Sequence, residues 1–190
     1  MPLTAPPFHA FTVKFPTLSR RILTQVGFTE AFNPSTPPPA LPDEVEAFAL
    51  WDTGATGSVL THSLIAKLGL TPTGMTQVNH AGGSDTVHTY LVNIILPNMV
   101  RFAGIVVSEM PDNGQFDAII GMDIICRGDF ALTNYNQQTS LSFRVPSMEP
   151  IDYVKESNRL AFAGVGRNDP CPCGKTENGA VVKYKRCHGK

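Results

Sequence analysis

The chain has 190 residues, of which 42% are hydrophobic and 16% charged. This length suits one ordinary domain with an appendage, because a single core typically spans ~100–150 residues, and it excludes a large multidomain protein. The net charge of −1 argues against binding nucleic acid over the whole surface, but residues 1–165 carry 9 basic and 14 acidic side chains and residues 166–190 carry 6 and 2.

The N-terminal part of the chain has the pattern of a β-rich domain. A strand is predicted at residues 11–15, where apolar and polar residues alternate, and a buried strand at residues 45–51. Proline fixes the backbone of residues 33–39 as an extended loop between them. Thr61 is placed to cap a short helix, which Gly69 ends.

More β-structure is expected after this helix. Residues 76–108 are typical of a hairpin with a flexible turn at residues 81–85. Residues 116–121 predict a short buried strand, and residues 122–126 one or two helical turns. The segment 130–143 has two short strands around a polar turn. The fold class expected from these patterns is mainly β, with one or two short helices.

The segment Asp52-Thr53-Gly54 places a carboxylate directly after the predicted strand 45–51. Peptide hydrolysis by carboxylates needs two of them close together: one takes a proton from water while the other donates a proton to the carbonyl oxygen. Like charges this close share one proton, so their two apparent pKa values separate. The chain has a single Asp-Thr-Gly. The second carboxylate must therefore come from another copy across a twofold axis.

Residues 11–145 resemble a retropepsin-type aspartic protease, a homodimeric family of retroviral and retroviral-like proteins. Residues 50–55 resemble its catalytic segment, which implies that Asp52 is the catalytic aspartate and that Thr53 forms a hydrogen bond across the dimer axis. Residues 116–123 resemble the second family signature, which closes a loop behind the catalytic turn. The resemblance implies a retropepsin-like acid-protease fold, an aspartic endopeptidase activity on polypeptides, and a homodimer.

Further site residues follow from the same resemblance. Gly54 completes the catalytic turn, and Ala55 lies in the substrate-binding position after it. Gly82 and Gly83 correspond to the tip of the flap that covers the substrate. The family's catalysis needs no cofactor. Trp51 departs from the family because it is bulkier than the residue usually found before the aspartate.

Other interpretations of these residues remain open at this point. Asp-Thr-Gly is also a common turn sequence, and a protease-like fold can bind peptides without cleaving them, so a catalytically silent adaptor is the alternative function. Asp123 suits a helix-start cap better than a catalytic acid. His62, His80 and His88 lack metal-ligand spacing and are expected at the surface. The hairpin 130–143 is a candidate dimer contact.

The tail carries four residues of the types that bind zinc. Cys171 and Cys173 flank one proline in a tight turn, and Cys187 and His188 are adjacent. Three thiolates and one imidazole suit tetrahedral zinc in a closed structural site. A module of about 25 residues buries little apolar surface, so metal binding would supply most of its folding free energy.

Residues 166–190 resemble the SEC-C motif, the zinc-binding tail of the bacterial preprotein-translocase ATPase. Residues 147–165, which precede this motif, are predicted as a linker that includes a short helix around residues 151–159. The gap between Cys173 and Cys187 is longer than usual, and Asn178-Gly179 predicts a hairpin within it. The resemblance implies structural Zn²⁺ and a docking role towards a protein or ribosome. Residues 1–146 are then the protease domain.

The sequence also indicates in which compartment of the cell the protein is expected. The N-terminus lacks a basic stretch that leads into an apolar run, so it does not resemble a signal peptide. The apolar region 90–107 is interrupted by Asn93, Pro97 and Arg101, whereas a membrane span needs ~20 apolar residues. Clustered cysteines point to metal rather than disulfides. We expect a cytoplasmic, bacterial protein with neither membrane nor DNA as a partner.

Overall fold

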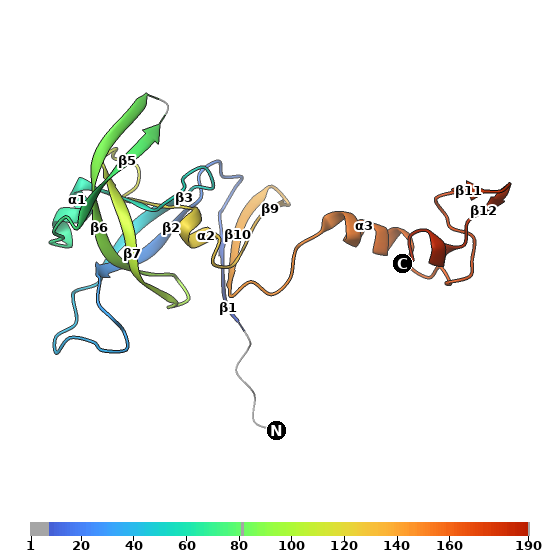
Figure 1. Ribbon diagram of the computed structural model, residues 1–190, viewed down its shortest axis with the longest axis horizontal. Coiled ribbons are helices and arrows are strands. Elements are labelled where there is room, and N and C mark those ends of the chain that lie inside the picture. The colour runs from blue at the N-terminus through green and yellow to red at the C-terminus, as the bar shows by residue number, and fades with distance from the viewer. Residues whose placement is uncertain (1–7, 81, 190) are drawn as a thin grey trace, which may run out of the picture. The chain divides into compact units, whose positions relative to one another are not determined.

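The computed structural model describes residues 8–80 and 82–189. The chain separates into two compact units, residues 1–148 and 149–190. Each unit has its own secondary structure (Figure 1). Among the described residues, no helix is both long and apolar enough to cross a membrane.

The first unit is mainly β-structure with two short helices, which confirms the expected fold class. Its strands and helices, in chain order, are β1 (His9–Lys14), β2 (Leu23–Glu30), β3 (Val45–Trp51), β4 (Val59–Thr61), α1 (His62–Lys67), β5 (Gly74–His80), β6 (Gly83–Ile95), β7 (Arg101–Met110), β8 (Ala118–Ile120), α2 (Met122–Ile125), β9 (Asp129–Tyr135) and β10 (Gln138–Val145).

Seven strands form one sheet in the order β2-β3-β8-β4-β7-β6-β5. An additional pairing between β2 and β6 curls this sheet back on itself. Strand β8 runs parallel to β3 and antiparallel to β4, so it lies between the two strands that flank the Asp52 loop. The side chains that face the inside form one apolar core, which includes Phe28, Leu60 and Ile120.

The remaining strands of this unit form a three-stranded sheet in the order β1-β10-β9. The sheet joins the core through an aromatic cluster around Trp51. The ring centroids of Phe143, Phe130 and Phe11 lie 5.3, 5.8 and 6.0 Å from that of Trp51. Aromatic pairs at these separations attract one another beyond their area burial. The bulk of Trp51 thus serves to join the two sheets.

Several local predictions are confirmed by the structure. The hydroxyl of Thr61 accepts a hydrogen bond from the Leu64 amide at the start of α1, and Gly69 follows this helix with a φ of +61°. The hairpin expected within 130–143 forms as β9 and β10. Its two turn residues, Asn136 and Gln137, have φ values of 51° and 59°. These left-handed values match a tight hairpin turn.

Two predictions about strands need correction. Strand β2 has no counterpart among the predicted elements, because the alternation of buried and exposed residues stops after Gln25, and residues 26–29 are all buried. The region 76–108 holds three strands rather than a single hairpin, since β7 pairs with β6 as well. Its first turn is shorter than expected, because His80 already faces Gly83.

The second unit contains α3 (Tyr153–Ala161), a small hairpin of β11 (Thr176–Glu177) and β12 (Ala180–Val181), and the 3₁₀ turn η1 (Tyr184–Arg186). The helix lies where a short helix was expected around residues 151–159. The hairpin turns at Asn178 and Gly179, whose φ values are 51° and 78°, as predicted from this dipeptide.

Candidate active site and metal centre

Asp52 directly follows β3, where the sheet fixes its backbone. Its amide donates a hydrogen bond of 3.0 Å to the carbonyl of Ile120 in β8. Its carboxylate oxygen Oδ1 accepts a hydrogen bond of 2.8 Å from the amide of Gly54, two residues further on. The carboxylate is half-buried, whereas Thr53 and Gly54 are exposed. The turn therefore presents an oriented carboxylate at the surface of this single chain.

The chain after Asp52 lies against the start of α2. The amides of Met122 and Asp123 donate hydrogen bonds of 2.8 and 3.2 Å to the carbonyls of Ala55 and Thr56. Gly121 makes this approach possible, because a Cβ at that position would lie 2.5 Å from the carbonyl oxygen of Gly57. The two predicted signatures, 50–55 and 116–123, thus meet backbone to backbone.

Ser58 adds a side-chain link between the same two segments. Its hydroxyl donates a hydrogen bond of 2.8 Å to the carboxylate of Asp123 and accepts one of 3.2 Å from the amide of Gly121. Ser58 is almost fully buried, with 1% of its surface exposed. The prediction that Asp123 caps α2 is wrong, because Gly121 occupies the N-cap position. Asp123 lies in the first turn of α2, and its carboxylate accepts hydrogen bonds from the Ile124 amide at 3.1 Å and from Ser58, a residue with no distinguishing sequence signal.

A second buried hydrogen bond supports the residue before Asp52. The indole Nε1 of Trp51 donates to the hydroxyl of Thr24 on β2, at 2.8 Å. Both side chains belong to the interior, with 5% and 3% of their surface exposed. Thr24 was not predicted as a site residue because the strand that carries it, β2, was not predicted either. No short-range pattern links Thr24 to Trp51, because the two residues lie 27 positions apart in the sequence.

The proposed flap residues lie in a different part of the sheet. Gly82 and Gly83 are at the tip of the β5–β6 hairpin, and both are exposed (Figure 1). Gly83 has a φ of +138°, a conformation that side chains disfavour. Ala55 lies in the Asp52 loop, where its amide donates a hydrogen bond of 3.2 Å to the carbonyl of Asp52. The hairpin predicted to be a flap and the aspartate thus lie on separate elements.

A polar cluster that the sequence did not reveal lies at the base of this hairpin. The carboxylate of Glu109 on β7 accepts hydrogen bonds from the backbone amide of His88 at 2.9 Å and from the Tyr90 hydroxyl at 2.8 Å. The His88 ring lies 2.8 Å from the same carboxylate, and that of His62 lies 4.0 Å from it.

These contacts shift the ionisation of the cluster. The hydrogen bond from the His88 backbone, followed by those of Tyr90 and the His88 ring, lowers the pKa of Glu109 to about 2. Burial, together with the adjacent carboxylate, raises the pKa of Tyr90 to about 12. His62 and His88 are half exposed, with 55% and 48% of their side-chain surface accessible, which agrees with the expected surface positions. The side chain of His80 lies outside the described residues.

The four predicted metal ligands converge in the second unit. Their ligand atoms all lie within 4.8 Å of one another. The Nδ1 of His188 is 3.3 Å from the sulfur atoms of both Cys171 and Cys187, and the sulfur of Cys173 lies 3.4 and 3.5 Å from those of Cys171 and Cys187. Tetrahedral zinc, with bonds of about 2.0–2.3 Å, fits a donor set of this kind and size.

Backbone hydrogen bonds hold the two halves of this Cys/His cluster together. The amide of Cys171 donates to the carbonyl of Val182 at 2.8 Å, and the amide of Tyr184 donates to Asp169 at 2.8 Å. The ring of Phe162, just after α3, contacts that of His188 at a centroid distance of 4.6 Å. The end of α3 therefore packs on one of the four predicted metal ligands, a contact that no sequence pattern predicted.

The thiols in this cluster differ in their acidity. Backbone hydrogen bonds, foremost that of Lys175, lower the pKa of Cys173. The neighbouring thiols, foremost Cys173, raise the pKa of Cys187 to about 11. Three thiolates cannot crowd together without a cation to balance their charge. The donor set is therefore the kind that divalent zinc stabilises.

One segment of the first unit matches a known protein family. Residues 42–124 match a family model described as aspartyl protease. This segment includes Asp52 and ends within α2. Similar solved structures include a retropepsin-like aspartic protease from Rickettsia conorii, with 15% identity, a TM-score of 0.43 and coverage of 73% of this chain and 95% of that one. The EIAV protease has 22% identity, a TM-score of 0.42 and coverage of 57% and 88%.

The curated relatives are protein translocase subunits SecA. Identity is 67% over 30 residues for Variovorax paradoxus and 41% over 59 residues for Nocardioides sp.. These matches cover 16% and 29% of this chain, but only 3% and 6% of the SecA proteins. Together with the Cys/His cluster, they support the SEC-C resemblance of the tail. The chain thus combines a segment that matches the aspartyl protease family model with a tail that resembles the SEC-C motif and brings three cysteines and one histidine together.

Proposed function

We propose that this protein is an aspartic endopeptidase whose active site forms between two copies of the chain. The observation that carries this proposal is the Asp52 carboxylate, oriented by the Gly54 amide at the end of a strand inside an aspartyl protease segment. A single chain supplies one Asp-Thr-Gly. Two copies related by a twofold axis would supply the pair that the chemistry requires.

In this dimer the two Asp52 carboxylates share one proton. The ionised carboxylate removes a proton from a water molecule, which attacks the carbonyl carbon of the peptide bond, while the protonated one donates to the carbonyl oxygen. Collapse of the tetrahedral diol then breaks the C–N bond. The carboxyl that took the proton from water gives it to the departing amine, and the other carboxylate recovers a proton from a diol hydroxyl, which restores the shared proton. Thr53 would form a hydrogen bond across the dimer axis, and Ala55, Gly82 and Gly83 would line the peptide.

The tail has a separate role in this proposal. Cys171, Cys173, Cys187 and His188 would hold structural Zn²⁺, which supplies folding free energy to a unit with little apolar core. The basic residues Lys183, Lys185 and Arg186 lie on the same small module. We assign to this module the docking of a protein or ribosome, which brings the protease to its substrates.

Mixing of subunits tests the composite active site. A fixed amount of wild type is incubated with increasing amounts of an Asp52→Asn chain, and exchange is verified by co-purification through a tag on one chain. Because a mixed dimer has one carboxylate, cleavage of a peptide library should fall as the wild-type homodimer is diluted into mixed dimers. Undiminished cleavage after verified exchange would overturn the dimeric site. A strictly monomeric active enzyme would do the same.

A further inference from the structure

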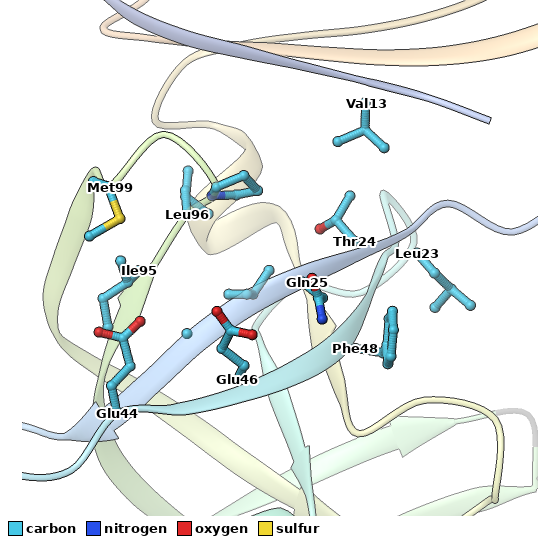
Figure 2. Close-up of a pocket in the computed structure, with 13 residues that line it drawn as sticks. Val13, Leu23, Thr24, Gln25, Glu44, Glu46, Phe48, Ile95, Leu96 and Met99 are labelled. Atoms are coloured by element: carbon cyan, nitrogen blue, oxygen red, sulfur yellow. The ribbon is translucent and has the colours of Figure 1, made fainter.

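A groove of about 460 Å³ runs along β2. Its walls come from β1, β2, the start of β3 and the turn between β6 and β7 (Figure 2). Figure 2 shows Val13 opposite Thr24 across the groove, with Glu44 and Glu46 towards the end where Ile95 and Met99 lie. We call this feature the β2 groove.

The β2 groove contains an open strand edge. On one side, β2 pairs with β3 along its length, and the Trp51 amide donates to the carbonyl of Ile22. In an antiparallel pair, alternate residues bond to the same neighbour. The peptide groups of Ile22, Thr24 and Val26 therefore face β3, and those of Leu23 and Gln25 face the other side.

The second neighbour of β2 ends too early to cover that side. Strand β6 pairs with β2 only from Gly27 onwards, opposite Ile95, because the chain then turns at Pro97. Within residues 8–80 and 82–189, no strand pairs with Leu23 or Gln25 on this edge. An open edge of this kind is a template for an added strand.

The side chains around the edge are apolar and acidic. Phe48 and Met99 line the groove although 53% and 73% of their surfaces are exposed. The carboxylate of Glu44 lies over Gly27, where a side chain would clash with it. Within the described part of the chain, neither Glu44 nor Glu46 has an ion pair or a side-chain hydrogen bond. Such a surface complements a segment with both basic and apolar side chains.

We propose that the β2 groove is a second polypeptide-binding site, which takes an extended segment carrying Lys or Arg between apolar residues. The segment adds as a strand to Leu23 and Gln25 and places its cationic side chains beside Glu44 and Glu46. Apolar side chains cover Phe48 and Met99. This site is separate from the Asp52 turn and binds whether or not the chain cleaves peptides, so its test is independent of the proposed activity.

The groove also touches the support of the Asp52 turn. Thr24 lines the groove, and its hydroxyl accepts the hydrogen bond from Trp51, the residue before Asp52. A strand added along Leu23 and Gln25 would stiffen this part of β2. Occupancy of the groove therefore acts on the same backbone that positions the carboxylate.

The test uses full-length protein with Asp52→Asn, so that the probe stays intact, and a fluorescent heptapeptide of alternating valine and lysine. We expect saturable binding that an active-site inhibitor of acid proteases does not displace. The double variant Glu44→Gln/Glu46→Gln should weaken binding about tenfold or more, since close charge pairs contribute strongly to association. Glu30→Gln, the same change at the far end of β2, should leave binding unchanged.

Two further measurements separate strand addition from simple charge attraction. Amide hydrogen exchange should slow at Leu23 and Gln25 when the peptide binds, whereas Thr24 and Val26 are already protected by β3. A peptide N-methylated at alternate residues, which cannot donate along one edge, should bind far more weakly. Unchanged exchange at Leu23 and Gln25 under saturation, or full affinity of the methylated peptide, would overturn the proposal. Displacement by the active-site inhibitor would overturn it too.

Discussion

The indole nitrogen of Trp51 and the hydroxyl of Thr24 form a hydrogen bond of 2.8 Å inside the core, one residue before Asp52. A buried indole N–H that has no acceptor lowers the stability of the fold by more free energy than the hydrogen bond itself adds. The bond therefore ties the backbone before Asp52 to β2.

Replacement of Thr24 by valine tests this bond, because valine preserves the shape of threonine and removes its acceptor. We expect the free energy of unfolding in urea, followed by circular dichroism, to fall by about 1–3 kcal/mol. In the double variant Thr24→Val/Trp51→Phe the N–H is also gone, so the loss should be smaller than the sum of the two single losses. Strict additivity would contradict a direct bond.

The close approach at Gly121 makes a second prediction. Gly121→Ala would place a methyl group 2.5 Å from the carbonyl oxygen of Gly57. We expect a loss of about 1–3 kcal/mol in unfolding free energy, as for other overpacked sites. Gly57→Ala is the matched control, because a Cβ there meets no atom within 4 Å. Equal stability of the two variants in urea titrations would show that the segments are not in contact.

The Glu109 cluster predicts how stability depends on pH. The pKa of Glu109 is lowered in the folded chain from 4.5 to about 2. Its stabilising contribution is therefore complete above pH 4.5 and disappears as the pH falls towards 2. Each pKa unit corresponds to about 1.4 kcal/mol.

Urea titrations from neutral to acid pH check this dependence. The wild type should lose stability through this window, and Glu109→Gln should be less stable at neutral pH and show a flatter profile. Glu30→Gln should follow the wild type, because the described structure gives the Glu30 carboxylate no hydrogen-bond partner. A Glu109→Gln profile parallel to the wild type would show that the cluster does not titrate as described.

Metal content tests the tail. Elemental analysis should find one zinc per wild-type chain, and Cys171→Ser should lose it. Cys126→Ser is the control, because Cys126 is exposed in the first unit and should not affect zinc. Trp51, the only tryptophan, reports on the first unit, so its fluorescence transition should be the same in all three proteins. Full zinc content in Cys171→Ser would contradict the assigned ligand set.

The sequence predicted best what adjacent residues decide. Thr61 as a helix cap and Asn178-Gly179 as a hairpin turn depend on interactions within a few residues, and both appear in the structure. Strand β2 was missed because it is covered on both faces at residues 26–29, so the period-two pattern disappears. A period-two pattern therefore fails to predict a strand whose two faces are both buried.

Sites built from residues that lie far apart in the sequence could not be predicted either. Glu109 meets His88 and Tyr90 through the pairing of β6 with β7, and no short motif encodes that meeting. The cluster of Cys171, Cys173, Cys187 and His188 was predictable because these residue types are rare and lie close together in the sequence. Phe162 packs on His188 from a segment that has no metal-binding residue type.

The most direct test of the central claim is hydrolysis of a mixed peptide library by wild type, Asp52→Asn and Asp43→Asn. Asp43 is exposed in the loop before β3, so its substitution makes the same chemical change outside the proposed site. We predict cleavage by wild type and by Asp43→Asn, and none by Asp52→Asn with an unchanged dimer and circular dichroism spectrum. Cleavage by Asp52→Asn at the wild-type rate would contradict the assignment of Asp52 as the catalytic carboxylate.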